Sequence, residues 1–253
     1  MPGLPKDFAD FQKKFPKSLQ ITNFEGDDDR RKKFLLFNNY VGTSRREYAV
    51  TFVSQAGLEA LLRFPIWVMD GTFETAPSFP KFKQIFVIVG VDAEHRSFPL
   101  LWSFLSHKTP KCYLEGVLVP LRRALLDYIA QCNSDFDIDE IKAKICVTDY
   151  EKGISNAIKS VFPNFSVYGC MFHWKQAIKF KVDKIGLAKF YASRSPTGKI
   201  FRRFVSMVMA LTYVHPAHVK HYYKALAKNM RQKFADKTSV WFKNKTQVGF
   251  FFC

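Results

Sequence analysis

Acidic residues are scarce in the last third of this sequence. After Glu151 the 253-residue chain has no glutamate and only two aspartates, Asp183 and Asp236. Residues 171–253 nevertheless hold 17 lysines and arginines, so they carry +15 of the formal net charge of +17. A segment this basic attracts polyanions by releasing their counterions. Charge alone does not separate DNA from RNA or from an acidic membrane surface.

Long apolar runs and a secretory leader are also missing. No run approaches the roughly 20 residues of a membrane-spanning helix, and residues 1–6 contain no hydrophobic leader segment. No membrane partner is therefore expected. The five cysteines are odd in number and widely spaced, which fits a reduced intracellular protein better than a disulfide framework. The apolar content of 47% and aromatic content of 16% predict a folded core.

Hydrophobic patterning predicts an ordered series of elements after a polar tail over residues 1–33. Strands are expected at 34–37, 47–53, 66–70, 84–91, 98–104, 145–149 and 165–170. Helices are expected near 55–62, over 112–131 with Pro120 interrupting it, and over 152–161 and 172–182. The short connection between 84–91 and 98–104 predicts that these two strands pair antiparallel.

Two of the predicted strands end in an aspartate, Asp70 and Asp149. A helical crossover separates the strands, so they can lie side by side in parallel, with both carboxylates at one edge. Adjacent carboxylates repel unless a cation neutralises them, and such pairs build two-metal sites. The alternative is that each aspartate caps the turn or helix that follows it. Glu151 has two interpretations as well, as an assisting ligand or as an acid favoured by a helix N-terminus.

This order of strands and helices is that of the ribonuclease H-like fold, whose metal-binding carboxylates occupy the same two positions. We therefore expect an α/β fold with a ribonuclease H-like mixed five-stranded sheet and flanking helices, followed by a partial basic all-helical region. The expected domains are a tail over 1–33, a core over 34–182 and a basic helical region over 183–253.

Three short strings follow these strands in order. They are Asp70-Gly71-Thr72-Phe73, Thr148-Asp149-Tyr150-Glu151 and Gly169-Cys170-Met171-Phe172-His173. Together they resemble the transposase domain of Mutator-like elements, over roughly residues 34–235. The resemblance implies cut-and-paste DNA transposition, with transposon ends and target DNA as partners. Asp70 and Asp149 would be the first two acids of the family's Asp-Asp-Glu triad, and they would hold two Mg²⁺ or Mn²⁺ ions.

The third acid of the triad is where the sequence departs from the family. The family places a glutamate well downstream, and this chain has none after Glu151. Asp236 is the candidate that remains, although its side chain is one methylene shorter. We therefore expect a truncated or decayed transposase whose catalysis is impaired.

Cys170 and His173 form a family string whose role the sequence leaves open. Two ligands do not make a structural zinc site, which needs four. The histidines at 215, 218 and 221 either supply further ligands or decorate a basic helix. Zn²⁺ is not expected.

DNA contacts are expected from basic residues of the last third, namely Lys175, Lys179, Arg202 and Arg203. Two functions remain in competition: an active DNA transposase, and a non-catalytic DNA-binding relic or host-adapted derivative. A small ribonuclease H-like nuclease is a third interpretation. The expected location is the nucleus, since residues 30–33 are a basic cluster that suits import, although a solvated linker fits as well. Homo-oligomerisation is left open.

Overall fold

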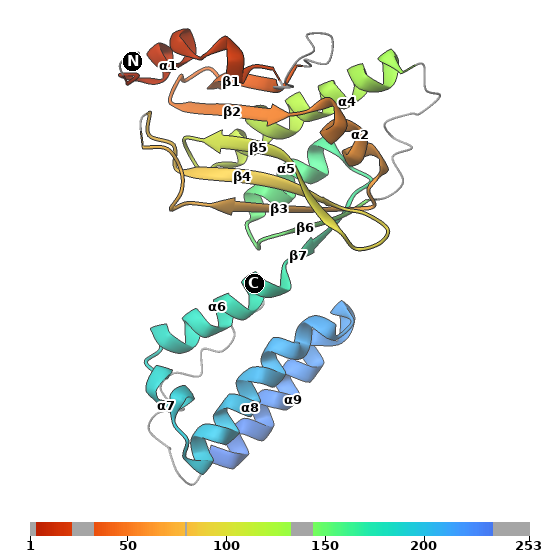
Figure 1. Cartoon of the computed structure of the whole chain (residues 1–253). Helices are drawn as coiled ribbons and strands as arrows, with labels where there is room; N and C mark the ends of the chain where they lie inside the picture. The colour runs from red at the N-terminus through yellow and green to blue at the C-terminus, as the bar shows by residue number, and fades with distance from the viewer. Residues whose placement is uncertain (1–3, 22–32, 79, 133–143, 235–253) are drawn as a thin grey trace. The chain divides into compact units, whose positions relative to one another are not determined.

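Two units make up the chain in the computed structural model, which describes residues 4–21, 33–78, 80–132 and 144–234. The first unit is Met1–Cys170 and the second is Met171–Cys253. The first contains a mixed sheet with helices, and the second is helical where it is described (Figure 1). The boundary expected after residue 182 falls inside helix α6 (Met171–Lys184), which belongs as a whole to the second unit.

The sheet has seven strands in the order β1-β2-β5-β4-β3-β6-β7. Their bounds are β1 Leu35–Val41, β2 Glu47–Val53, β3 Ile66–Thr72, β4 Gln84–Val91, β5 Ser97–Leu105, β6 Ile145–Thr148 and β7 Ser166–Gly169. The pairs β3/β6 and β6/β7 are parallel and the others are antiparallel. The predicted antiparallel pairing of 84–91 with 98–104 and the parallel β3/β6 pairing are confirmed.

The expected five-stranded sheet is wrong in its strand count. Both N-terminal strands form as the patterning predicts, but they extend this same sheet. β2 pairs antiparallel with β5, from Ala49 opposite Leu105 to Val53 opposite Leu101. Local patterning identifies a strand without identifying its partner, because backbone pairing is decided by which edge is free.

One face of the sheet is covered by helices that bury its apolar side chains (Figure 1). These helices are α2 (Gln55–Arg63), the short α3 (Pro110–Tyr113), α4 (Val119–Gln131) and α5 (Lys152–Val161). Ser54 caps α2 by accepting a hydrogen bond from the Gly57 N–H at 3.0 Å. The core joins strand residues with helix residues at helical spacing, among them Trp67, Met69, Ile88, Leu101, Cys146, Leu121, Leu125, Ile154 and Ile158.

A π-helical turn, η3 (Leu114–Leu118), joins α3 to α4 close to Pro120, which was expected to interrupt a continuous helix. Proline has no N–H, so it cannot donate to the carbonyl of Gly116, four residues earlier. That carbonyl accepts a hydrogen bond from the buried Thr51 hydroxyl of β2 at 2.7 Å. A Cβ on Gly116 would lie 2.6 Å from the Ala49 Cβ, so glycine permits this close approach of helix and sheet.

The opposite face of the sheet carries a second, aromatic cluster at β2. Helix α1 (Phe8–Lys14) packs there, with the Phe8 ring stacked 4.8 Å from the Tyr48 ring, and Phe11 and Phe15 join the cluster. The region expected as a polar tail therefore includes a helix that is packed on the core.

The second unit consists of helices with their own apolar core. They are α6, α7 (Ala188–Ala192), α8 (Pro196–Ala210) and α9 (Pro216–Phe234), with a 3₁₀ turn, η5 (Leu211–Tyr213), before α9. α8 begins at Pro196 after the capping Ser195, and α9 begins at Pro216. The core is built from Ile178, Val182, Leu187, Phe201, Val205, Val208, Leu211, Tyr223 and Met230. Across the described residues, no helix has both the length and the apolarity needed to cross a membrane.

Candidate functional site

The relative positions of Asp70 and Asp149 follow from the register of two neighbouring parallel strands. Ile66 of β3 pairs with Ile145 of β6, and Val68 pairs with Val147. Continued by two residues, this register brings Asp70 beside Asp149, with both side chains on the same face because side chains alternate along a strand. Both residues line one small pocket of about 10 Å³, roughly the space of one water molecule.

The two carboxylates are held by backbone N–H groups. Asp70 is exposed within β3, and its Oδ1 accepts a hydrogen bond from the Gly71 N–H at 2.8 Å. Asp149 is half-buried just after β6, and its Oδ1 accepts one from the Glu151 N–H at 3.1 Å. The bond to Glu151 N–H turns the chain from β6 into α5, so Asp149 stabilises the turn that follows its strand, as the alternative interpretation expected.

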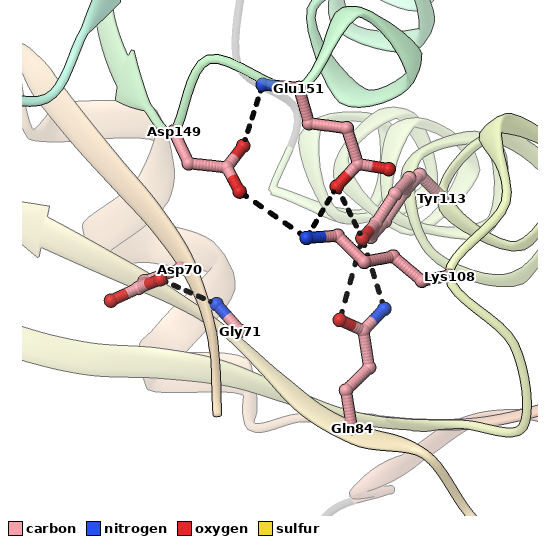
Figure 2. A network of polar contacts seen from close by, with 7 residues as sticks. All are labelled: Asp70, Gly71, Gln84, Lys108, Tyr113, Asp149 and Glu151. Carbon is pink, nitrogen blue, oxygen red and sulfur yellow. Dashed lines mark hydrogen bonds and ion pairs between the residues drawn. The ribbon is translucent and has the colours of Figure 1, made fainter. Parts of the chain in front are cut away.

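Lys108 brings a cation to the carboxylates (Figure 2). Its Nζ lies 2.9 Å from Glu151 Oε2 and 3.6 Å from Asp149 Oδ2. It also lies 5.0 Å from the centre of the Phe73 ring, within reach of a cation–π interaction. Partial burial lowers the pKa of Lys108, but the hydrogen bond and charge of Glu151, together with Asp149, outweigh burial and raise that pKa overall. Lys108 therefore stays charged at neutral pH.

Glu151 occupies the N-cap position of α5, yet within the described residues its side chain makes no capping bond to that helix. Its Oε2 accepts from the Lys108 ammonium and from the Tyr113 hydroxyl, the latter at 3.3 Å. The helix dipole still favours an acid at this position. The contacts of the carboxylate, however, are directed toward the site (Figure 2).

Tyr113 and Gln84 form the buried floor of this network. Tyr113 is 2% exposed and Gln84 is fully buried. Gln84 Nε2 donates to the Tyr113 hydroxyl at 3.1 Å. Burial raises the pKa of Tyr113, and the charges of Glu151 and Asp149 add to this effect while the Gln84 bond opposes it. The phenol therefore keeps its proton and can donate.

Sequence reasoning did not identify Lys108, Tyr113 or Gln84 as site residues. Lys108 follows β5, Tyr113 ends α3, and Gln84 begins β4, so no single string contains them. Their only local signal is a lysine and a tyrosine five residues apart between the expected strand 98–104 and helix 112–131.

The donor set suits a hard divalent cation. Mg²⁺ is commonly bound through one or two carboxylates, with water and substrate phosphates completing its coordination. Asp70 and Asp149 meet that minimum for one ion. Over the residues described, no three His, Cys, Asp or Glu side chains are grouped closely enough to hold a metal by themselves. Asp236, the expected third acid, lies outside the described residues.

Residues 66–177 match the family described as the MULE transposase domain. This stretch of the chain is therefore similar to a MULE transposase domain. It runs from β3 into α6 and includes Asp70, Lys108, Tyr113, Asp149 and Glu151. No curated protein matches the chain.

The Cys-x-x-His string of the MULE domain crosses the boundary between the two units. Cys170 is half-buried after β7, and its N–H donates to the Thr148 carbonyl at 2.7 Å. His173 lies in α6 of the second unit. Farther along, the rings of His215 and His218 lie 5.9 Å apart at the start of α9. The role of the string stays a prediction.

The basic residues expected to contact DNA have different surroundings. Lys175 and Lys179 lie one turn apart on α6 of the second unit, and Lys179 is exposed. Arg203 is exposed on α8, beyond the match to the MULE domain. The neighbouring Arg202 is half-buried and donates to the carbonyls of Tyr191 (2.8 Å) and Ser193. Arg202 therefore links α8 to the end of α7 through these hydrogen bonds.

Proposed function

We propose that this chain is a transposase-derived protein with a ribonuclease H-like core that binds DNA and performs metal-dependent phosphodiester cleavage and strand transfer at Asp70 and Asp149. The observation that carries the proposal is the parallel β3/β6 register, which brings these two carboxylates to one pocket of the MULE domain. The mixed sheet, with its parallel β3-β6-β7 half, supports the ribonuclease H-like assignment.

Asp70 and Asp149 would hold Mg²⁺ or Mn²⁺ at the pocket. Such an ion supplies an activated water or 3′-hydroxyl and stabilises charge at the scissile phosphate. The backbone N–H groups of Gly71 and Glu151 each hold one carboxylate oxygen, of Asp70 and of Asp149 respectively. The protein thus positions the ligands, and Lys108 adds a positive charge that would attract the phosphate backbone.

We also propose that catalysis is weaker than in an intact transposase. Lys108 pairs with both Asp149 and Glu151, so its ammonium competes with an incoming cation at these carboxylates. These same observations favour the second candidate function, a DNA-binding relic or host-adapted derivative that has lost strand chemistry. Both functions share DNA as the partner and the nucleus as the location. Transposases act on two DNA ends, so self-association also belongs to the proposal.

A nicking assay on supercoiled DNA with Mn²⁺ tests the enzyme proposal. We expect slow nicking by the full chain that Asp70→Asn and Asp149→Asn abolish, while the exposed α4 variant Asp127→Asn leaves it unchanged. DNA binding without nicking would support the second candidate function, a DNA-binding relic or host-adapted derivative. Nicking that survives both aspartate substitutions would reject the proposed site, because it would come from another source.

A further inference from the structure

We propose that Glu151 is a positioning residue, which holds the Lys108 ammonium at the pocket of Asp70 and Asp149 so that Lys108 binds a phosphate group of the DNA. The proposal rests on the function proposed above and adds to it one phosphate contact and the side chains that fix it. Lys108 lines the pocket and Glu151 does not, so Glu151 acts on the site through Lys108.

The surroundings of the Lys108 ammonium are the first argument. Its Nζ lies 2.9 Å from Glu151 Oε2, within hydrogen-bonding distance, but 3.6 Å from Asp149 Oδ2, which is too long for a hydrogen bond. An ammonium group has three N–H donors, and the Lys108 side chain is 38% exposed. Glu151 therefore holds the ammonium and leaves it with donors that can reach a phosphate oxygen.

A chain of hydrogen bonds behind Glu151 is the second argument (Figure 2). Gln84 Nε2 donates to the Tyr113 hydroxyl at 3.1 Å, and this hydroxyl donates to Glu151 Oε2 at 3.3 Å. The same oxygen accepts from Lys108, so the chain runs in one consistent direction. Gln84 is fully buried and Tyr113 is 2% exposed. Because buried side chains have little freedom, their hydrogen bonds fix the Glu151 carboxylate.

The close approach of Gly71 to Gln84 is the third argument. A Cβ at Gly71 would lie 2.8 Å from Gln84 Oε1, so a larger residue at position 71 would shift the buried amide. Gly71 directly follows Asp70 on β3. The hydrogen-bonded chain that ends at Lys108 is therefore packed, at its other end, against the strand that carries one of the two acids.

The benefit of holding Lys108 is conformational. A free lysine side chain samples many rotamers, and this freedom is lost when its ammonium binds a phosphate. A lysine that is already held loses less. The contact with Glu151 is also shorter than the contact with Asp149, so a cation bound at Asp149 would leave Lys108 paired with Glu151 beside the pocket.

Fluorescence anisotropy of labelled duplex DNA with the full chain, in EDTA and over a series of salt concentrations, tests the proposal. We expect Lys108→Met to lower the slope of log affinity against log salt by about 0.9, the change for one lost phosphate contact. We expect Glu151→Gln to weaken binding about threefold, because the released lysine must be immobilised when DNA binds. Electrostatics alone predicts the opposite sign, since the substitution removes an anion beside the DNA.

A double-variant cycle shows whether Glu151 acts through Lys108. In the Lys108→Met chain, Glu151→Gln should cause no further weakening, because no ammonium is left to hold. Lys108→Arg keeps the charge and should retain the native salt slope. Tyr113→Phe changes no charge and should weaken binding by less than Glu151→Gln does. Asp10→Asn and Lys14→Met make the same changes at the ion pair of α1 and are the matched controls, which should leave affinity and slope unchanged. Far-UV circular dichroism establishes that each variant is folded.

The outcomes separate this proposal from the proposed function. An unchanged salt slope in Lys108→Met, in a chain that binds DNA, would overturn the phosphate contact and leave the proposed function standing. Tighter binding in Glu151→Gln, or the same weakening with and without Lys108, would overturn the positioning role. A native chain that binds no DNA would overturn the proposed function and this proposal with it.

Discussion

Asp70 and Asp149 stand at the same register of adjacent parallel strands, four residues after the paired Ile66 and Ile145. Neighbouring strands lie about 4.8 Å apart, so the backbone of the sheet fixes the separation at which the two carboxylates begin. Neither acid depends on a long loop for its position. The sheet therefore holds both acids in fixed positions. Lys108 lies on the connection between β5 and α3, so its side chain has more freedom to move.

Tyr113→Phe is expected to lower the free energy of unfolding by about 1–2 kcal/mol. The substitution removes a hydroxyl that pairs with the fully buried Gln84, and an unsatisfied buried amide costs that much. Urea denaturation followed by circular dichroism measures the change. Tyr168→Phe on β7, where the ring is 55% exposed, is the control and should change stability little. Equal effects of the two substitutions would contradict the role given to the buried pair.

Gly116→Ala is expected to destabilise the first unit by about 1–3 kcal/mol, the usual cost of overpacking a core. The added methyl group would meet the Ala49 Cβ at 2.6 Å, so helix and sheet must separate. Ala49→Gly in the same chain removes the colliding atom. Thermal unfolding of both single variants and the double variant should show that the second substitution relieves the first. Strictly additive losses would show that the contact is not the cause.

Lys144 is expected to make stability depend on alkaline pH. It is 3% exposed, and burial lowers its pKa from 10.5 to about 8, while its Nζ donates to the carbonyls of Leu62 and Phe64, both at 2.7 Å. Between these two pKa values the unfolded chain binds more protons than the folded chain. The free energy of unfolding should therefore rise as the pH increases from about 8 to about 10.5, by at most about 3 kcal/mol.

Lys144→Met provides the comparison for this pH dependence. Denaturation with urea at several pH values from about 7.5 to about 9.5 should show a rise in the native chain that the variant lacks. Parallel pH profiles for the two proteins would mean that Lys144 titrates alike in the folded and unfolded chains.

DNA binding is expected to weaken in Lys179→Ala and Arg203→Ala and to become less sensitive to salt. Removing one cation from a DNA phosphate lowers the slope of log affinity against log salt by about 0.9. Fluorescence anisotropy at several salt concentrations measures both quantities, with Lys14→Ala in α1 as the control because Lys14 already pairs with Asp10. Unchanged slopes would place the DNA surface elsewhere.

Arg202→Ala should behave differently from Arg203→Ala. Its guanidinium holds two backbone carbonyls between α7 and α8, so its loss should lower the stability of the second unit by about 1–3 kcal/mol. Thermal unfolding of the two variants side by side distinguishes them. Equal melting temperatures would show that the carbonyl bonds of Arg202 contribute nothing measurable.

Much of the first unit could be predicted from the sequence, because its strands have strong local patterns. The β-branched run of β4 and the helical crossover before β6 were sufficient to predict the antiparallel and parallel pairs around Asp70. The edge strands could be predicted as strands but not as members of this sheet. Helix α1 could not, although Phe8, Phe11 and Phe15 have helical spacing, because a short helix among polar residues gives a weak signal.

Of the residues at the site, only the acids could be predicted from the sequence. A strand that ends in aspartate is visible in a string of five residues, and the topology then brings two such strings together. The Lys108–Glu151 pair joins residues that lie 43 positions apart, across helices and a strand, and no local pattern links them. Contacts of this kind depend on the packing of α3 against α5, which is decided by the whole core.

The π-helical turn at Leu114–Leu118 also links two positions that are distant in the sequence. Because Pro120 offers no N–H, the Gly116 carbonyl is available to the Thr51 hydroxyl, and this bond joins the start of the helix to β2. An amide restored at position 120 would compete for the same carbonyl, and the buried Thr51 hydroxyl would then depend more on its bond with the Ser103 hydroxyl. Substitutions at positions 51 and 120 should thus be tolerated together more readily than singly, so the two residues are expected to change as a pair during divergence.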